Sequence, residues 1–452
     1  MPLGYGKIIS MYSLLELPSL LSFDRENFST LSADPLCVSI DSRTVKPKDV
    51  FIAIEGVRYD GHHFCEEAIQ KGAAAIIISN KKYLTKKVPC FYVKNTMQTL
   101  MFLAHQFRKR FTGCVFAVTG SSGKTTVKEL LRHVFSEEYP VLATNENFNN
   151  QIGVALFLLS LDNFYKIAVV EAGISQEGDM DELSWMIQPD SVVITHIHPS
   201  HIEGLGCIEN IAKEKTKLLK FSKKGADFYF HKDEKLLQET AKNFDVSFKE
   251  VDWEKSSLIK GYLSDWPVFM KKNAALVGFI AQYKNIKIEK IGNSLRTFGG
   301  VGRRFMSEMI HKVRFIDDTY NSNPGSLREG LRALASMSAK RVIVCLGDMG
   351  ELGESAKEWH ESIWQDIVLL KPDRLILVGK IMPHLYREKF SSLFEKDTTR
   401  LARRVDQVIP LWNEQLFPGD IVYAKGSRAI QLDLWMDHVK NHWRKTKKDS
   451  SE

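Results

Sequence analysis

Short apolar runs alternate with longer amphipathic stretches along almost the whole chain. The runs at 74–79 (AAIIIS), 115–120 (VFAVTG), 166–173 (KIAVVEAG) and 191–197 (SVVITHI) have strand length and are bounded by turn or polar residues. Such runs are typical of buried strands, and the stretches between them have the length of helices. The alternation predicts an α/β fold with parallel sheets.

The same rhythm begins again in the last third of the chain, with runs at 313–318 (VRFIDD), 341–348 (RVIVCLGD), 374–379 (RLILVG) and 420–426 (DIVYAKG). We expect these four runs to form a separate, Rossmann-like sheet.

Two breaks divide the chain, at Phe111–Gly113 and at the glycine-rich FGGVG of 298–302. A chain of 452 residues is also too long for one hydrophobic core. We therefore predict three domains, at 1–110, 111–299 and 300–452.

The composition, 44% hydrophobic and 26% charged, is that of a soluble globular protein. No run of about 18 apolar residues is present, so we expect no membrane span. Glu16 and Pro18 interrupt the apolar residues near the N-terminus, which therefore does not resemble a signal peptide. The six cysteines form no C-x-x-C pair, which favours buried thiols in a reducing cytoplasm over a zinc site or disulfides.

A net charge of +7 is mild for this length and suits an anionic substrate such as a nucleotide. The most basic stretch, at 444–448, is best explained as a solvated helix end. We therefore expect no nucleic-acid partner.

Residues 119–126 (TGSSGKTT) join the run VFAVTG to the amphipathic stretch that follows it. A glycine-rich turn between strand and helix directs backbone N–H groups at phosphate oxygens, and the helix N-terminus adds a favourable dipole. We expect Lys124 on the terminal phosphates and Thr125 on a magnesium ion. Val118 stands where the usual pattern has its first glycine, so the loop is a shortened variant. The predicted ATP-binding residues of the loop are Gly120, Ser121, Ser122, Gly123, Lys124, Thr125 and Thr126.

Two further residues follow apolar strands and are candidates for the metal site. Glu171 ends KIAVVE, and His201 comes soon after SVVITHI. Ligands of open α/β sheets bind at the carboxyl ends of strands, where a carboxylate and an imidazole can complete one or two magnesium shells. Without the phosphate loop, His201 would be explained as an ordinary surface histidine.

Several segments, in their order along the chain, resemble the Mur ligase family of peptidoglycan synthesis. They are 41–73 (DSRTVKPKDVFIAIEGVRYDGHHFCEEAIQKGA), the phosphate loop, 144–156 (TNENFNNQIGVAL), 171–173 (EAG), 201–206 (HIEGLG), 317–327 (DDTYNSNPGSL), 346–353 (LGDMGELG) with His360, and 419–428 (GDIVYAKGSR). The resemblance implies an N-terminal uridine-nucleotide domain, a central P-loop-type ATPase domain and a C-terminal ligase domain that contacts ATP and the amino substrate.

The last third resembles the family member that adds D-alanyl-D-alanine to UDP-N-acetylmuramoyl-tripeptide. In that reaction ATP phosphorylates the terminal carboxylate of the tripeptide, and the amine of the dipeptide attacks the acyl phosphate. The resemblance therefore implies ATP, two magnesium ions and these two small molecules as partners, and we expect a monomer. Whether the third residue of the tripeptide is lysine or diaminopimelate stays open.

Family members also hold the second magnesium with a carbamylated lysine at a fixed distance after the metal-binding histidine. Counting from His201 identifies Lys215. Carbamylation needs the neutral amine, whereas a free lysine has a pKa of about 10.4, so the site must disfavour the charged form. The implied catalytic residues are Lys124, His201 and Lys215, and the implied metal ligands are Thr125, Glu171, His201 and Lys215.

The resemblance also implies residues for each substrate. Ser42 and Arg43 correspond to contacts with the uridine diphosphate, and Asn149 and Asn150 to residues beside the peptide and phosphates. The further positions that match ATP contacts are Asn273, Arg303 and Asp318. The loop associated with the amino substrate contributes Asn321, Asn323 and Pro324, although asparagine and proline are also common in ordinary turns.

The chain departs from the family at three places. Ala172 replaces a usual methionine, His196 replaces a usual asparagine, and an adenine-binding segment is reduced to DWPVFMKKNAAL, of which only Asn273 and Ala274 match.

Three alternatives are a sibling ligase that adds a diamino acid, a folate polyglutamate ligase, and a nucleotide-binding regulatory protein without catalysis. DDTYNSNP, LGDMGELG and KGSR argue against the first two. The presence of Lys124, Glu171 and His201 argues against the third.

Overall fold

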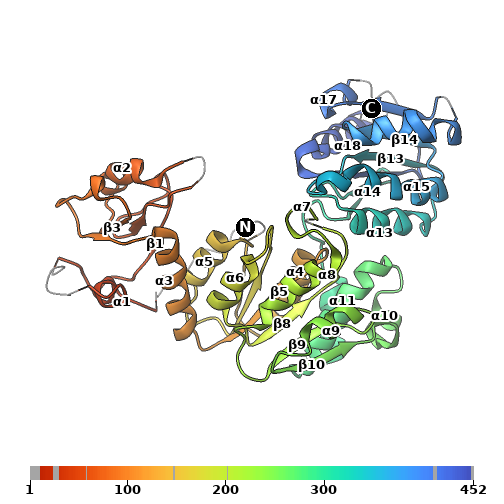
Figure 1. Ribbon diagram of the computed structural model, residues 1–452. Coiled ribbons are helices and arrows are strands. Elements are labelled where there is room, and N and C mark those ends of the chain that lie inside the picture. Colours follow the sequence, from red (N-terminus) through yellow and green to blue (C-terminus); the bar gives the residue numbers. More distant parts are fainter. Residues whose placement is uncertain are drawn as a thin grey trace.

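The computed structural model describes residues 11–23, 30–56, 59–145, 148–200, 202–395, 397–410 and 415–448. They form three parts in chain order, each built on one sheet, with the central part between the other two (Figure 1). Every ladder of these sheets is parallel except the pairing of β11 with β12. The predicted α/β class is confirmed.

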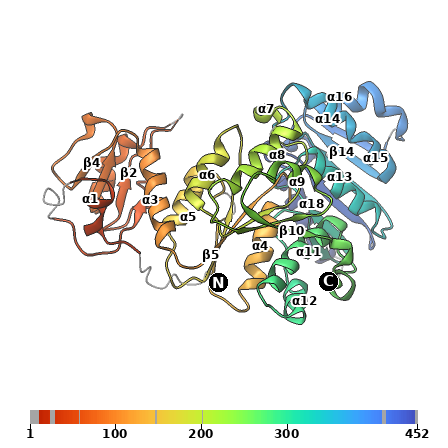
Figure 2. The same cartoon turned by 60° about the horizontal axis from the view of Figure 1, so that its bottom comes forward.

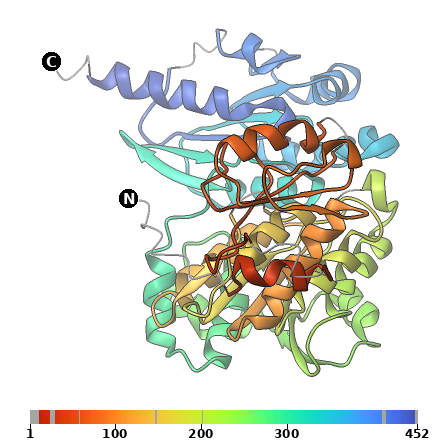
Figure 3. The same cartoon turned by 90° about the vertical axis from the view of Figure 1, so that its left-hand side faces the viewer.

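The N-terminal part has a four-stranded sheet in the order β1-β2-β3-β4. Its strands are β1 (Val38–Ser39), β2 (Val50–Ile52), β3 (Ala75–Ile78) and β4 (Cys90–Tyr92), and its helices are η1 (Leu14–Glu16), α1 (Leu17–Leu20), η3 (Gly61–Phe64), α2 (Cys65–Gln70) and η4 (Lys81–Tyr83). Figure 3 shows this part in front of the rest of the molecule when it is viewed from its N-terminal side.

Helix α3 (Thr96–Arg110) connects the N-terminal sheet to the central part. The side chain of Asn95 accepts a hydrogen bond from the Gln98 N–H and so begins the helix. Near the other end, the buried Arg108 donates to the Ile187 carbonyl at 2.7 Å and to the Asp190 carboxylate at 2.8 Å. Because α3 packs against α5 (Gln151–Leu159) and α6 (Asp179–Ile187), its apolar side chains share a core with both parts.

The central sheet has six strands in the order β10-β9-β8-β5-β7-β6. The strands are β5 (Cys114–Thr119), β6 (Val141–Ala143), β7 (Ile167–Glu171), β8 (Ser191–Ile194), β9 (Ala226–His231) and β10 (Val246–Val251). The remaining helices of this part are α4 (Lys124–Phe135), α7 (Ile202–Leu205), α8 (Ile208–Thr216), η5 (Lys217–Leu219), α9 (Lys235–Ala241), η6 (Trp253–Lys255), α10 (Ser257–Tyr262), α11 (Val268–Tyr283) and α12 (Ile288–Arg296).

Helices cover both faces of the central sheet (Figure 2). Side chains of a strand alternate between faces, so Val115 and Ala117 pack toward α5 and α6, whereas Phe116 and Val118 pack toward α4 and α11. Strands β7 and β6 lie on one side of β5, and β8, β9 and β10 lie on the other. The strand order therefore reverses beside β5, and open α/β sheets bind ligands at such a point.

The C-terminal sheet has the order β11-β12-β16-β13-β14-β15. Its strands are β11 (Met306–Ile310), β12 (Val313–Asp317), β13 (Val342–Gly347), β14 (Arg374–Val378), β15 (Thr399–Ala402) and β16 (Ile421–Lys425). Its helices are α13 (Pro324–Ala335), η7 (Gly353–Ser355), α14 (Ala356–Ser362), α15 (Trp364–Leu370), α16 (Ile381–Leu385), η8 (Tyr386–Phe390), η9 (Ser391–Leu393), α17 (Val405–Val408), η10 (Arg428–Ile430) and α18 (Leu432–Lys448). One face packs against α18 and the other against α13 and α15.

We propose the domain limits 1–110, 111–299 and 300–452, which fall between α3 and β5 and between α12 and β11. Of the helices in the described part of the chain, none has both the length and the apolar character needed to cross a bilayer.

Candidate functional site

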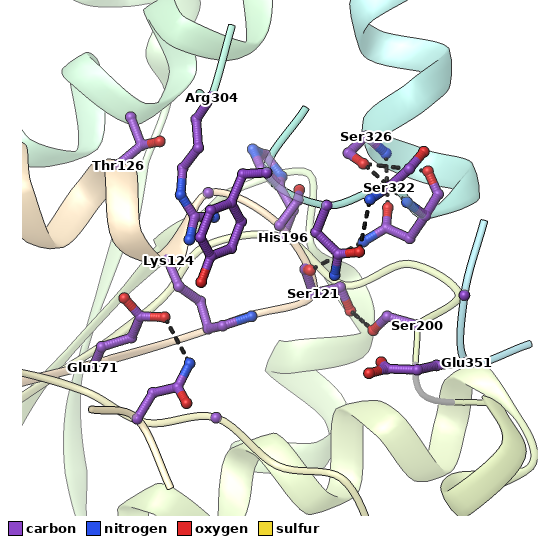
Figure 4. Close-up of a pocket in the computed structure, with 18 of the residues that line it drawn as sticks. Ser121, Lys124, Thr126, Glu171, His196, Ser200, Arg304, Ser322, Ser326 and Glu351 are labelled. Carbon is purple, nitrogen blue, oxygen red and sulfur yellow. Dashed lines mark hydrogen bonds between the residues drawn. The ribbon is translucent and has the colours of Figure 1, made fainter. Parts of the chain in front are cut away.

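A cavity of about 370 Å³ lies between the central and C-terminal parts. This volume is within the range of small-molecule sites. The central part contributes the phosphate loop, the ends of β7 and β8 and the start of α11. The C-terminal part contributes the loop after β12, the first turns of α13 and the end of β16. Figure 4 shows Lys124 and Glu171 on one side of this cavity, Ser322 and Ser326 on the other, and Ser121 and His196 between them.

The phosphate loop follows β5 directly, as the sequence predicts. Gly123 is the N-cap of α4 and has a φ of 79°, a left-handed conformation that a residue with Cβ adopts only with strain. The loop is fastened to the end of β8, because the Ser121 N–H donates to the His196 carbonyl at 2.7 Å and the Ser121 hydroxyl to the His198 carbonyl at 2.7 Å. Backbone N–H groups at the start of α4 are thereby held at the cavity edge.

Lys124 is the first residue of α4, and its side chain bends back over the loop. Its Nζ donates to the carbonyl oxygen of Gly120 at 2.8 Å. Burial lowers the pKa of this ammonium group, and the nearby carboxylate of Glu171 opposes that shift. A polyphosphate in the cavity would meet the lysine beside the helix N-terminus.

Thr125 and Glu171 meet below the loop, since the Thr125 hydroxyl donates to Glu171 Oε2 at 2.7 Å. The other carboxylate oxygen accepts a hydrogen bond from Asn149 Nδ2 at 3.1 Å. Both Thr125 and Glu171 are nearly fully buried. Hydroxyl and carboxylate oxygens are the ligands that magnesium prefers, so these two side chains fit a magnesium site next to the phosphate loop.

His201 lies outside the described residues. Within the residues that are described, no three His, Cys, Asp or Glu side chains form a metal-ligating cluster. The placement of the predicted metal histidine therefore stays a prediction.

Lys215 lies on α8 and is fully buried. Its Nζ has no hydrogen-bond partner among the described residues. Burial, and next the positive charge of Lys124, hold the pKa of Lys215 well below its usual value, against the opposing influence of Glu214. The geometry therefore favours the neutral amine, the form that carbamylation requires.

Asp318 follows β12 and is the centre of a polar network in the C-terminal part. Its Oδ1 accepts from the Phe305 N–H at 3.1 Å, and its Oδ2 accepts from the Tyr423 hydroxyl at 3.1 Å and pairs with Lys425 Nζ at 2.8 Å. Burial raises the pKa of Asp318, and Lys425 opposes that shift. Lys425 also donates to the Asn321 carbonyl at 3.0 Å and so holds the loop after β12.

Three family descriptions match the chain in order. The description "Mur ligase family, catalytic domain" matches residues 37–108, "Mur ligase middle domain" matches 118–276, and "Mur ligase, glutamate ligase domain" matches 303–428. The chain is also 30% identical over 426 residues to the UDP-N-acetylmuramoyl-tripeptide--D-alanyl-D-alanine ligase of Bacillus subtilis (strain 168), covering 88% of this chain and 91% of that protein. The chain belongs to the Mur ligase family.

Other relatives agree with this membership. The enzyme of the same name from Haemophilus influenzae is 29% identical over 427 residues, covering 88% of this Mur ligase and 92% of the relative. The crystal structure of MurF ligase from Thermotoga maritima in complex with ADP superposes with a TM-score of 0.77 at 25% identity, covering 91% and 98% of the two chains. MurF from Acinetobacter baumannii gives 0.81 at 23% identity, covering 95% and 99%, and supports the fold alone.

This Mur ligase presents Arg304, and not the predicted Arg303, to the cavity. Arg303 is paired with Asp317 at 3.0 Å and with Asp437 at 2.8 Å. The guanidinium of Arg304 lies 3.7 Å from the centre of the Tyr320 ring. Only one of the two arginines faces the cavity because successive side chains point in different directions. Two arginines in a row in the sequence do not reveal which one it is.

The predicted asparagines have structural partners as well as positions at the cavity. Asn323 caps α13 through Ser326, and its Nδ2 approaches the Ser121 carbonyl at 3.5 Å across the two parts. Asn150 caps α5. Asn273 is buried beside Gly123, and its Oδ1 has no partner within the described part of the chain.

Asn321 lines the cavity with Asn150, Asn273 and Asn323, whereas Pro324 occupies the first turn of α13 and is absent from the lining.

Ser42 and Arg43 lie in the N-terminal part, which contributes no residue to the cavity lining. The Ser42 hydroxyl donates to Glu67 at 2.8 Å, and Arg43 pairs with Asp41 while 82% of its side chain is exposed. The structure therefore separates the predicted uridine-nucleotide residues from the phosphate loop.

Sequence reasoning missed Arg304, Lys425, Glu329 and His196 as cavity residues. Lys425 had a detectable signal, since it directly follows an apolar strand in the segment GDIVYAKGSR. Glu329 had none, because it is one polar position on the amphipathic helix α13.

Proposed function

We propose that this Mur ligase joins D-alanyl-D-alanine to UDP-N-acetylmuramoyl-tripeptide at the expense of ATP, giving the pentapeptide precursor of peptidoglycan. One observation carries the proposal: the phosphate loop with Glu171 and the Asp318–Lys425 network face the same cavity from two domains. A carboxylate, a phosphoryl donor and an amine could meet there. The relatives that span nearly the whole chain carry the name of this reaction.

The phosphate loop and Lys124 would hold the terminal phosphates, with Arg304 approaching from the C-terminal domain. Fixed positive groups and backbone dipoles stabilise the charge that develops on a transferred phosphoryl group. Because Ser121 hydrogen-bonds the phosphate loop to the residues after β8, the backbone N–H groups of the loop are in place before the substrate arrives. We assign Asn273 and Asp318 to the nucleotide, and Arg303 to joining β12 and α18 of the C-terminal domain through Asp317 and Asp437.

Thr125 and Glu171, with His201 and Lys215, would hold one or two magnesium ions. When bound, such an ion neutralises phosphate charge and acts as a Lewis acid. Lys215 would contribute as a carbamate, because its buried neutral amine is ready to react with carbon dioxide. The hydrogen bond between the Thr125 hydroxyl and Glu171 brings these two oxygen ligands together and supports the assignment.

The other substrate groups are assigned to different domains. Ser42 and Arg43 would bind the uridine diphosphate, Asn149 and Asn150 the peptide end, and the loop with Asn321, Asn323 and Pro324 the amino substrate. A closing movement would bring the tripeptide carboxylate to the γ-phosphate and exclude water from the acyl phosphate. We further propose that the enzyme acts as a monomer in the cytoplasm.

The test is phosphate release by the purified protein supplied with ATP and UDP-N-acetylmuramoyl-tripeptide, with and without D-alanyl-D-alanine. Lysine- and diaminopimelate-containing tripeptides are compared in parallel. We expect release to depend on the dipeptide and the pentapeptide to appear by mass spectrometry. Phosphate release that does not depend on the dipeptide, with either tripeptide, would contradict the proposed function.

A further inference from the structure

His196 lies just beyond β8, and its backbone carbonyl accepts the bond from Ser121 of the phosphate loop. The imidazole is held on two sides. Its Nδ1 lies 2.9 Å from Glu234 Oε1, and its ring stacks on that of His231 with centroids 4.9 Å apart and planes 8° from parallel. Only 7% of the residue is exposed. The ring is therefore fixed in position and orientation.

The contact with Glu234 determines which ring nitrogen is free. A carboxylate can only accept, so Nδ1 carries the hydrogen and Nε2 of the neutral ring keeps its lone pair. Nε2 has no hydrogen-bond partner among the described residues, although His196 lines the cavity. A buried polar atom without a hydrogen-bond partner destabilises the folded protein unless a ligand or a water molecule forms that hydrogen bond. The free nitrogen thus marks a place for a donor group.

Glu329 approaches the same cavity from α13 of the opposite domain. Within the described part of the chain, its carboxylate forms no hydrogen bond or ion pair. Burial raises the pKa of Glu329, and the strongest opposing influence is His196. The imidazole therefore contacts Glu234 directly, and Glu329 lines the same cavity from the opposite domain.

Charge decides which substrate group suits this place. The other charged or titratable groups around His196, Glu329 and the two neighbouring histidines are His198, His231, Lys124, Lys215, Asp233, Lys272, Asp318 and Lys425. Burial keeps His198 and His231 neutral, with the pKa of each lowered to about 3. Lys272 pairs with Asp233 at 2.7 Å, and Lys425 pairs with Asp318. Within the described residues, the carboxylates of Glu234 and Glu329 have no lysine or arginine partner, and a carboxylate attracts an ammonium group. Lys124 and Arg304 lie near each other at the phosphate loop of the same cavity, where they suit the phosphates.

We propose that His196 and Glu329 bind the ammonium group of the amino substrate and that His196 Nε2 removes its proton before the amine attacks the acyl phosphate. Glu234 is a positioning residue that holds the imidazole. The inference rests on the proposed function and adds the base that its second step needs.

The proton balance is complete without a further reactant. The ammonium nitrogen has no lone pair, so one proton must pass to Nε2 before a C–N bond can form. Attack by the amine then breaks the bond between the acyl carbon and the phosphate oxygen. The second proton of the nitrogen leaves with the inorganic phosphate, and His196 returns its proton to solvent when the products leave.

The test compares two nucleophiles with His196→Asn and Glu329→Gln. Hydroxylamine is largely uncharged at neutral pH, so it captures the acyl phosphate as a hydroxamate without needing a base. We expect amide formation with D-alanyl-D-alanine to fall about 100-fold in His196→Asn, the usual contribution of a general base. Hydroxamate formation should stay close to the wild-type rate in both variants, which also shows that they are folded.

The pH profile gives a second readout. In the wild type, kcat/KM for the dipeptide should depend on pH less steeply than in the variant, because an enzyme base accepts the proton of the bound ammonium group. In His196→Asn it should keep rising with pH, because only the fraction of free amine reacts. Glu234→Gln should retain much of the amide rate, since its carbonyl oxygen still accepts the Nδ1 hydrogen, whereas Glu234→Ala should not.

Matched controls come from the exposed pair His384 and Glu388, 3.3 Å apart on the C-terminal domain. His384→Asn and Glu388→Gln should leave both rates unchanged. An unchanged amide rate in His196→Asn, or an equal loss of hydroxamate and amide, would overturn the proposal. Failure of the wild type to form any hydroxamate with ATP and the UDP-tripeptide would instead refute the proposed function.

Discussion

At the scale of single residues, burial and partners determine what each charged group can do. Lys124 and Lys215 belong to one neighbourhood, because the charge of Lys124 contributes to the lowered pKa of Lys215. Lys124 has a backbone acceptor at 2.8 Å, whereas Lys215 has no partner in the described part of the chain. The first is equipped to remain an ammonium group beside phosphates, and the second to be neutral.

Lys124→Ala should abolish turnover and leave uridine-nucleotide binding intact. Loss of a group that stabilises the transferred phosphoryl should lower kcat by about 10²–10³ or more. Phosphate release measures the first effect, and calorimetric titration with the UDP-tripeptide measures the second. An equal loss of both would contradict the assignment of the two substrates to different domains.

Lys215→Ala should also lose activity, and short carboxylates such as acetate should restore part of it if a carbamate is present in the wild type. The exposed neighbour Lys213 on the same helix provides the control. Lys213→Ala should behave as the wild type, with and without acetate. Wild-type activity in Lys215→Ala would remove this lysine from the proposed metal site.

His231 makes stability depend on pH. Its pKa is lowered to about 3 by burial, first, and by His196, so the unfolded chain binds a proton below about pH 6.5 and the folded one does not. Stability is therefore lost as the pH falls below that value, by about 2 kcal/mol at pH 5. His231→Phe keeps a ring against His196 and should reduce the fall measured by urea unfolding at pH 7 and pH 5. The same fall in both proteins would contradict this attribution.

At the scale of elements, periodicity predicted most interior strands of the central and C-terminal sheets. All eight apolar runs overlap strands: β3, β5, β7, β8, β12, β13, β14 and β16. The missed strands include β1, β2, β4 and β6, which have two or three residues, and the edge strands β10, β11 and β15, whose exposed positions break the apolar run. An edge or very short strand is stabilised by its neighbour, which a local pattern does not contain.

Gly123→Ala tests the junction of β5 and α4. An alanine there would need a φ near 79°, and its Cβ would lie 3.0 Å from Asn273 Oδ1. We expect a loss of about 1–3 kcal/mol in stability, nucleotide affinity or both, from strain at a left-handed position. Thermal unfolding and ADP titration measure these. Gly261→Ala is the control, because nothing lies within 4 Å of its Cβ.

At the scale of the whole molecule, the site exists only where two domains dock. Phe269 of α11 meets Phe305 with ring centroids 5.1 Å apart, and Gly325 at the start of α13 lies against the ring of His198. By contrast, the N-terminal domain is joined to the central one through the shared core along α3.

Gly325→Ala should weaken docking of the C-terminal domain, because its Cβ would lie 2.5 Å from the His198 ring. Overpacking of this kind costs about 1–3 kcal/mol. We expect a lower kcat for the complete reaction and unchanged binding of the UDP-tripeptide, with Gly261→Ala again as the control. Weaker UDP-tripeptide binding would show that the change spreads beyond this interface.

The sequence by itself determined the α/β class, the phosphate loop and the family, because each depends on local patterns: apolar periodicity, a glycine at a helix start, and motifs in a fixed order. It also identified Lys124, Thr125 and Glu171 as candidates, and the structure brings these three together at one edge of the central sheet. Only the tertiary structure decided which of two adjacent arginines faces the cavity. Only it placed Lys425, His196 and Glu329 around the same cavity as the phosphate loop, because a cavity lined from two domains depends on how the two sheets dock.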